Sequence, residues 1–145
     1  MNLTGTYDRN LDAKGRLSLP ATLRKVLPDR VYVIPAPDAD ALYVFTEDTF
    51  EAWKDSVFVA QGGYDPTDSE HIEIRRQLNG AATTLDIDSA ARISLPESAR
   101  SLKGLEREVS VVGNGDRLEI WDRNTWVAHQ QASSALLANF FGRKA

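Results

Sequence analysis

Cysteine is absent from this 145-residue sequence, which contains only one methionine and two histidines. The absence of cysteine excludes disulfide bonds, thiol nucleophiles and zinc sites with cysteine ligands, and it is typical of proteins in a reducing cytoplasm. No apolar run approaches the roughly 20 residues that a membrane-spanning helix needs. Charged residues at positions 8, 9, 12, 14 and 16 leave no apolar core for a secretory signal. We therefore expect a cytoplasmic protein without a membrane segment.

Catalytic patterns are also missing from the sequence. His71 and His129 lie in predicted helices with no carboxylate or serine at a recognisable motif spacing, which is typical of surface helix residues. The segment Gly113-Asn114-Gly115 begins a dinucleotide-binding fingerprint, but it lies in a predicted hairpin and not before a helix. We therefore expect no enzyme activity, no cofactor, no metal and no small-molecule substrate.

Basic residues are outnumbered, 17 against 21 acidic ones, and the net charge of −4 has the wrong sign for binding nucleic acid over the whole surface. Their distribution is uneven, because residues 9–30 carry a local charge of +4 whereas residues 38–70 carry −8. Runs of charge are typical of solvated surface. The basic run therefore points to nucleic acid only in combination with the motif that it contains.

An internal repeat is present in the sequence. Residues 11–20 (Leu-Asp-Ala-Lys-Gly-Arg-Leu-Ser-Leu-Pro) reappear at 87–96 (Ile-Asp-Ser-Ala-Ala-Arg-Ile-Ser-Leu-Pro), an offset of 76. The same offset places residues 42–45 (Leu-Tyr-Val-Phe) on residues 118–121 (Leu-Glu-Ile-Trp). Two separated blocks that share one offset indicate a tandem duplication.

Each unit has the same predicted order of elements. Leu17 and Leu19 alternate with Arg16 and Ser18, which indicates a half-buried strand with the arginine on its other face. A proline then opens a short helix, and a hairpin and a second helix follow. The predicted hairpin strands are 31–34 with 42–45 and 108–112 with 117–121, and the expected N-caps of the following helices are Thr46 and Asp122.

A linker and a further helix are predicted between the units. Residues 62–66 form a Gly-rich linker, and residues 67–70 have the form of a capping box that opens a helix to about Leu78. The tail, residues 123–141, is also predicted to be helical. Its loose apolar stripe, which we expect to pack within the chain, consists of Trp126, Leu137 and Phe140.

The motif Asp-x-x-x-Arg precedes the first strand of both repeats, as Asp12–Arg16 and Asp88–Arg92. In a structural interpretation, the aspartate caps local N–H groups and pairs with the arginine. In a functional interpretation, a pseudo-twofold axis brings two outward arginines to related positions, as duplex DNA offers equivalent contacts around twofold axes. The planar guanidinium then bonds guanine edges or phosphates bidentately, while the aspartate holds the loop and the arginine.

The first copy of the motif has two additional features. Lys14 adds a possible phosphate contact, and Gly15 allows a close approach of the backbone. The second copy has Ala90 and Ala91 in these places, so we expect it to hold phosphates more weakly.

Residues 12–20, residues 88–96 and the segment Arg-Leu-Glu-Ile-Trp-Asp at 117–122 resemble the MraZ family of bacterial regulators of the division and cell-wall gene cluster. The resemblance extends from about Leu3 to about residue 130. It implies an α+β fold of two AbrB-like units, each a double-split β-α-β element, related by a pseudo-twofold axis. It also implies a ring-shaped homo-oligomer, nucleoid-associated, that binds double-stranded DNA at direct repeats upstream of its own operon, usually as a repressor.

The implied DNA contacts and domain boundaries follow from the same resemblance. The implied contact residues are Asp12, Lys14, Gly15, Arg16, Asp88 and Arg92. The expected parts of the chain are a first AbrB-like unit (1–60), a linker with a connecting helix (61–80), a second unit (81–130) and a C-terminal helix or tail (131–145). The alternative function is an oligomeric assembly or protein-interaction module, in which the two motifs are structural salt bridges.

Overall fold

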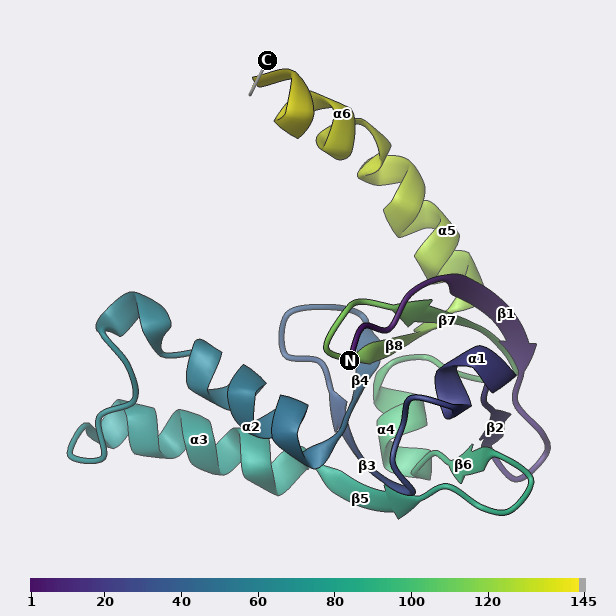
Figure 1. Cartoon of the computed structure of the whole chain (residues 1–145), viewed down its shortest axis with the longest axis horizontal. Coiled ribbons are helices and arrows are strands. Elements are labelled where there is room, and N and C mark those ends of the chain that lie inside the picture. The colour runs from purple at the N-terminus through teal and green to yellow at the C-terminus, as the bar shows by residue number, and fades with distance from the viewer. Residues whose placement is uncertain (144–145) are drawn as a thin grey trace.

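A six-stranded antiparallel sheet in the order β1-β7-β8-β4-β3-β5 forms the centre of the fold, and β2 and β6 pair in a separate two-stranded ladder (Figure 1). The structure is a computed structural model that describes residues 1–143. The strands are β1 (Thr6–Asn10), β2 (Arg16–Ser18), β3 (Arg30–Pro35), β4 (Ala41–Phe45), β5 (Thr83–Asp86), β6 (Arg92–Ser94), β7 (Glu108–Gly113) and β8 (Leu118–Asp122). The helices are α1 (Ala21–Arg24), α2 (Glu47–Ser56), the 3-10 turn η1 (Val59–Gln61), α3 (Ser69–Ala81), α4 (Glu97–Leu102), α5 (Arg123–Ala132) and α6 (Ser134–Arg143). The fold is therefore of the expected α+β class.

An internal twofold relation connects the two halves. Leu17 pairs with Ile93 in the β2–β6 ladder, and Tyr43 pairs with Glu119 between β4 and β8, so that each pair joins residues 76 positions apart. The strand order is symmetric about the same line, because β4, β3 and β5 mirror β8, β7 and β1. This is the arrangement that a tandem duplication produces.

The first strand of each repeat pairs with the hairpin of the other repeat. Strand β1 lies along β7, and β5 lies along β3. The hydroxyl of Ser110 donates a hydrogen bond of 3.1 Å to Asp8 across a sequence separation of 102 residues. The two repeats are thus interleaved in one sheet.

One face of the sheet packs against β2, β6, α1 and α4. Leu17 and Ile93 lie at the centre of this core and are almost completely buried, whereas Ser18 and Ser94 on the other side of the ladder are exposed. The predicted alternation in these strands is confirmed. The apolar residues of both repeats thus build a single core, and the polar side of the ladder faces outwards.

The other face of the sheet carries an aromatic cluster under α2. Phe45 stacks on Trp53 with ring centroids 5.0 Å apart, and Leu78 of α3 joins the cluster. Lys54 of α2 is buried and donates a hydrogen bond of 2.7 Å to Asn79 of α3. These contacts join α2 and α3 into an arm that extends away from the sheet (Figure 1).

His71 corrects the expectation of a surface histidine. Its side chain is buried in the arm, its Nδ1 accepts a hydrogen bond of 3.0 Å from the backbone N–H of Asp65, and its ring lies 4.7 Å from that of Phe58. The expectation was wrong because the chain between α2 and α3 folds back over this side of the helix. His129, in contrast, is exposed as expected.

Of the three helix starts predicted from a polar N-cap residue, two agree with the structure. Thr46 and Asp122 are the N-caps of α2 and α5, and each accepts a hydrogen bond from the backbone N–H three residues later. The N-cap of α3 is Asp68, whose carboxylate accepts from the N–H groups of Glu70 and His71. A carboxylate competes well for two adjacent N–H groups, so α3 begins one residue later than a capping box at residue 67 predicts.

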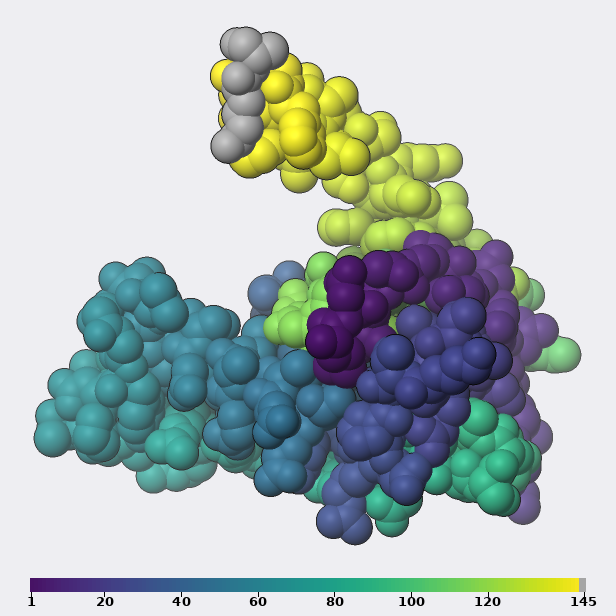
Figure 2. Space-filling model, viewed as in Figure 1, coloured from purple at the N-terminus to yellow at the C-terminus, as the bar shows by residue number. Residues whose placement is uncertain are grey.

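The C-terminal helices α5 and α6 leave the sheet and project from the molecule (Figure 2). Trp126 packs on Trp121 with ring centroids 5.3 Å apart, as expected, but the side chains of Leu137 and Phe140 are 69% and 46% exposed. For Leu137 the prediction that the apolar stripe packs within the chain was wrong, because α6 extends beyond the reach of the sheet. The last two residues of the predicted tail 131–145 lie outside the described residues. Within residues 1–143, every helix is too short or too polar for a membrane span.

Candidate nucleic-acid interface

The first motif forms a tight loop around the carboxylate of Asp12. Its Oδ1 accepts hydrogen bonds of 2.9 Å from the backbone N–H groups of Lys14 and Arg16, and its Oδ2 accepts one of 2.6 Å from Nε of Arg16. The backbone N–H of Gly15 donates to the carbonyl of Asp12, which closes the turn. The aspartate thus fixes both the loop and the direction of the arginine.

The second motif repeats this geometry. Oδ1 of Asp88 accepts hydrogen bonds of 2.9 Å from the N–H groups of Ala90 and Arg92, and its Oδ2 accepts one of 3.0 Å from Nε of Arg92. The backbone N–H of Ala91 donates to the carbonyl of Asp88. The same four positions therefore make the same bonds in both repeats.

Both aspartates are held in the ionised form. The pKa of Asp12 is lowered to about 2, chiefly by the hydrogen bond from the backbone N–H of Arg16, with further contributions from its guanidinium and from the N–H of Lys14. The pKa of Asp88 is lowered for the same reason by the backbone N–H of Arg92. Both ion pairs are consequently present at neutral pH.

The bond to the aspartate uses only one edge of each guanidinium. Among the described residues, Nη1 and Nη2 of Arg16 and Arg92 make no hydrogen bond, and about one third of each side chain is exposed. An arginine has five N–H donors in a fixed plane, so the two terminal nitrogens still offer a bidentate edge. Such an edge suits a phosphate or the O6 and N7 atoms of guanine.

The ladder of β2 and β6 brings the two motifs together. Arg16 is opposite Ser94, and Arg92 is opposite Ser18. Two further backbone hydrogen bonds extend the ladder, from Leu19 to the carbonyl of Ala91 and from Leu95 to the carbonyl of Gly15. The predicted site residues thus form one surface with two loops related by the internal twofold axis.

The two loops differ at the position before the arginine. Gly15 has a φ of +76°, and Ala91 occupies the corresponding left-handed conformation with a φ of +59°. A Cβ atom added at Gly15 would lie 2.5 Å from Cζ of Arg100. The space that this glycine leaves is thus filled by an arginine of the second repeat, a neighbour absent from the predicted site. The repetition of Arg24 as Arg100 is the signal in the sequence that points to it.

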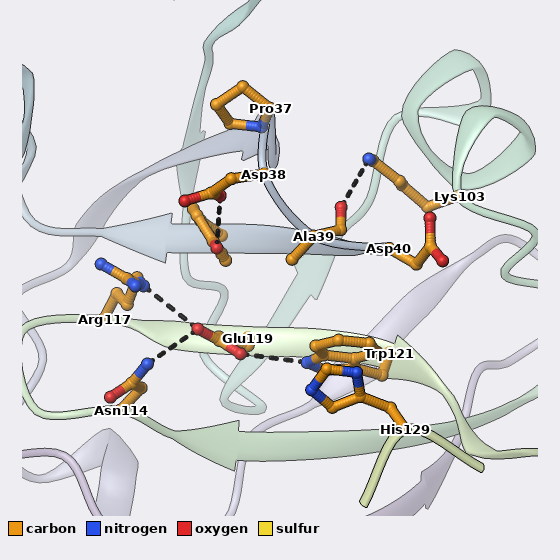
Figure 3. A pocket seen from close by; sticks show the side chains of 11 residues that line it. Pro37, Asp38, Ala39, Asp40, Lys103, Asn114, Arg117, Glu119, Trp121 and His129 are labelled. Carbon is orange, nitrogen blue, oxygen red and sulfur yellow. Dashed lines mark hydrogen bonds and ion pairs between the residues drawn. The ribbon is translucent and has the colours of Figure 1, made fainter. Parts of the chain in front are cut away.

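A hollow lies on the opposite face of the sheet, where β4 pairs with β8 (Figure 3). The hydroxyl of Tyr43 donates to Asp38, and burial raises the pKa of Tyr43. The carboxylate of Glu119 accepts hydrogen bonds from Asn114, Arg117 and Trp121. These polar groups satisfy one another within each repeat. A contact between the repeats comes from Lys103, whose Nζ donates hydrogen bonds of 2.8 and 2.7 Å to the carbonyls of Ala36 and Ala39. No motif in the sequence points to the hollow, because its lining residues come from several separate segments of the chain.

Comparison with known proteins agrees with the resemblance seen in the sequence. The model of the family described as "MraZ protein, putative antitoxin-like" matches residues 2–73 and 78–143. Its two matched segments correspond to the two repeats of the chain.

Three relatives, each named Transcriptional regulator MraZ, match most of the chain. The protein of Treponema denticola is 32% identical over 83% of this chain and 81% of its own length. That of Clavibacter michiganensis subsp. michiganensis is 36% identical over 93% and 91%, respectively. That of Burkholderia vietnamiensis is 39% identical over 90% and 89%. With the family match over nearly its whole length, the chain belongs to the MraZ family.

Proposed function

We propose that the protein is a sequence-specific DNA-binding transcriptional regulator and that it reads DNA with the paired loops of its two Asp-x-x-x-Arg motifs. The observation that supports this most strongly is the state of Arg16 and Arg92, whose Nε is held by an aspartate while Nη1 and Nη2 point to no partner among residues 1–143. A side chain fixed in this way loses little further freedom on binding. The names of the relatives agree with this role.

The proposed contact surface consists of the residues already expected from the sequence. In this proposal, Arg16 and Arg92 bind base edges or phosphates, Lys14 binds a phosphate, and the aspartates and Gly15 shape the loops. The contact set is Asp12, Lys14, Gly15, Arg16, Asp88 and Arg92. Residues 1–60 and 81–130 are proposed to be two AbrB-like units, with 61–80 as the connection and 131–145 as the tail.

Repeated sites on the DNA are part of the proposal. A protomer with a net charge of −4 and one small basic surface binds a single site weakly. A homo-oligomer, as a ring, on several boxes upstream of its own operon gains about 10²–10⁴ in avidity without a new contact. The acidic segment 38–70, which includes α2, keeps the remaining surface away from the phosphates. We propose repression of that division and cell-wall operon, and a nucleoid-associated location, as the result.

The alternative function is an assembly module in which the motifs are structural. The hydrogen bonds of Asp12 and Asp88 support this alternative too, because both ion pairs close a turn next to the core. The two functions differ in what happens when an arginine is removed. An assembly module loses melting temperature or oligomer size, whereas a DNA reader loses affinity for DNA.

The deciding experiment is fluorescence-anisotropy binding to the duplex immediately upstream of the gene, with a shuffled duplex as the control and a series of salt concentrations. For Arg16→Ala we expect a loss of discrimination between the duplexes of about 1–3 kcal/mol, the usual contribution of one bidentate base contact. Arg92→Ala should show a smaller loss. Arg76→Ala is the matched control, because this arginine lies on the exposed side of α3, in the arm far from the motifs (Figure 1).

Equal binding to both duplexes, or no binding by an intact oligomer, would contradict the proposal. A lower melting temperature of Arg16→Ala with unchanged DNA affinity would favour the assembly module.

A further inference from the structure

Arg100 belongs to the second repeat but lies on the loop of the first motif. Its Nε donates a hydrogen bond of 3.1 Å to the carbonyl of Leu95, and the N–H of Leu95 donates one of 3.1 Å to the carbonyl of Gly15. The guanidinium is in contact with Gly15 on the side where any other residue would carry a Cβ atom. The side chain is thus anchored at Nε beside the loop, as Arg16 is anchored by its aspartate.

The charge of Arg100 is not neutralised within residues 1–143. None of the described carboxylates forms an ion pair with it, and Nη1 and Nη2 make no hydrogen bond. A shallow hollow next to it is also lined by Asp12, Glu106 and Arg107. Asp12 is already occupied by Arg16, and the charges of Glu106 and Arg107 offset each other. The guanidinium therefore presents a free edge beside the first motif.

The corresponding arginine of the first repeat has a different environment. Arg24 donates from Nη1 to the carbonyl of Leu27 at 2.8 Å and from Nη2 to the carboxylate of Asp29 at 2.6 Å. Both of its terminal nitrogens and its charge are thus occupied. At the second loop, moreover, Ala91 carries the methyl group that Gly15 lacks.

These differences make the two loops electrostatically unequal. With Asp12, Lys14, Arg16 and Arg100, the first loop has a net charge of +2. At the second loop, Asp88 pairs with Arg92. Arg24, which corresponds to Arg100, pairs with Asp29, whose carbonyl accepts from the N–H of Ile87, so the charges of these four residues sum to zero. Phosphate contacts position a protein on DNA and respond to charge, whereas base contacts respond to geometry. The first loop is therefore suited to hold the backbone more strongly than its symmetry mate.

We propose that Arg100 binds a DNA phosphate beside the first motif and that residue 15 is a glycine because Arg100 occupies its Cβ position. The first loop is then the phosphate anchor of the interface, and the second loop binds without this contact. This inference rests on the proposed function and assigns to it a contact residue outside both motifs.

The test is the salt dependence of DNA binding by Arg100→Ala. Removing one phosphate contact lowers the slope of log Kobs against log salt by about 0.9. We expect this change, with a several-fold loss of affinity, on both the upstream and the shuffled duplex, because a phosphate contact carries no sequence information. The symmetry mate provides the matched control: Arg24→Ala should leave the slope unchanged. Arg100→Lys, which retains a cation, should retain most of the slope.

Gly15→Ala provides a second, independent test. The new methyl group displaces the guanidinium of Arg100, so this variant should show the reduced slope of Arg100→Ala. In an Arg100→Ala background, Gly15→Ala should add no further change in slope. Thermal melting shows which variants remain folded, and the slope is compared only among those.

The outcomes distinguish this inference from the proposed function. If Arg16→Ala loses discrimination while Arg100→Ala keeps the wild-type slope, the phosphate contact is wrong and the DNA-binding function stands. An equal fall in slope for Arg24→Ala also contradicts the inference, because it indicates a general effect of charge. If the wild-type protein does not bind the duplexes at all, both proposals fail.

Discussion

Each aspartate of the two motifs accepts hydrogen bonds from three N–H donors. Only Nε of the arginine is among them, so the two terminal nitrogens of its guanidinium keep their donors. Asp12 and Asp88 are acceptors for two backbone groups and one guanidinium edge. A carboxylate with three donors is stabilised in its charged form, which lowers its pKa. The loops therefore depend on ionised aspartates, and this dependence has a measurable pH range.

We predict that the Asp12 loop loses stability only in strong acid. The pKa of Asp12 is about 2 in the folded chain against an ordinary value of 3.8. Because the folded value is lower, the ionised carboxylate stabilises the fold above pH 3.8, and this contribution disappears as the pH falls towards about 2. The melting temperature of Asp12→Asn should lie below that of the wild type at neutral pH, and the difference should shrink between pH 4 and pH 2. A difference independent of pH would contradict this origin.

A second prediction concerns the left-handed residue of each loop. Ala91 has a φ of +59°, a conformation that costs a residue with a Cβ atom about 1–2 kcal/mol. Glycine avoids this steric cost, but part of the gain is lost because glycine loses more conformational entropy on folding. We expect Ala91→Gly to stabilise the protein by about 0.5–1 kcal/mol, a rise of a few degrees in melting temperature.

The opposite change at the equivalent position is the comparison for this prediction. Gly15→Ala should lower the melting temperature, because the methyl group meets both an unfavourable φ and the side chain of Arg100. If both substitutions changed the melting temperature in the same direction, the two loops would not be equivalent in backbone conformation.

At the scale of elements, the α2–α3 arm depends on a buried histidine. His71→Ala removes a buried ring from contact with Phe58 and leaves the N–H of Asp65 without its acceptor. We expect a cost of about 2–4 kcal/mol in the free energy of unfolding, measured by urea denaturation. His129→Ala is the control, because this residue is exposed and its ring is tilted against that of Trp121; its cost should be about 1 kcal/mol or less. Similar costs for both would contradict the burial of His71.

The sequence predicts most elements of the fold because they depend on local patterns. The N-caps Thr46 and Asp122 and the alternation around Leu17 are properties of a few neighbouring residues. The burial of His71 was missed, since it depends on the path of the chain between α2 and α3. Arg100 was missed as a neighbour of Gly15 for the same reason, because a residue from the other repeat lies there only after the repeats interleave.

The offset of 76 also holds only for part of the sheet. Asn10 pairs with Glu108, and its equivalent Asp86 pairs with Arg30, so that β7 follows β3 at an offset of 78. The offset returns to 76 at β8, because the first hairpin turn is two residues longer than the second. Six residues lie between Pro35 and Leu42, and four lie between Gly113 and Leu118. Turn lengths in the two hairpins absorb the change, which an ungapped comparison of the repeats does not detect.

At the scale of the whole molecule, helix α6 exposes apolar side chains that no other part of the described chain covers. Leu136 and Leu137 are 63% and 69% exposed on a helix that projects from the body (Figure 2). Exposed apolar side chains that gather on one helix face are typical of interaction surfaces. If the protein is a homo-oligomer, this face is suited to contact a second copy.

We therefore predict that Leu137→Glu lowers the oligomer mass measured by light scattering and leaves the melting of the sheet unchanged. On a duplex with two boxes, the variant should also lose the gain of about 10²–10⁴ in affinity over a single box that the proposed oligomer provides. Val59→Glu is the control, because Val59 is equally exposed (69%) but lies at the tip of the α2–α3 arm. A variant of monomer mass that still binds one box as tightly as the wild type binds two would contradict the requirement for repeated boxes.

The exchange of first strands between the repeats has a consequence for synthesis on the ribosome. Strand β1 is among the first segments to emerge, but its partner β7 follows about 100 residues later, as the separation of 102 between Asp8 and Ser110 shows. At about 5–20 residues per second, the nascent strand waits for roughly 5–20 s. During this time its unpaired edge is open to other chains. The first strand can therefore take its place in the sheet only after most of the second half has been translated.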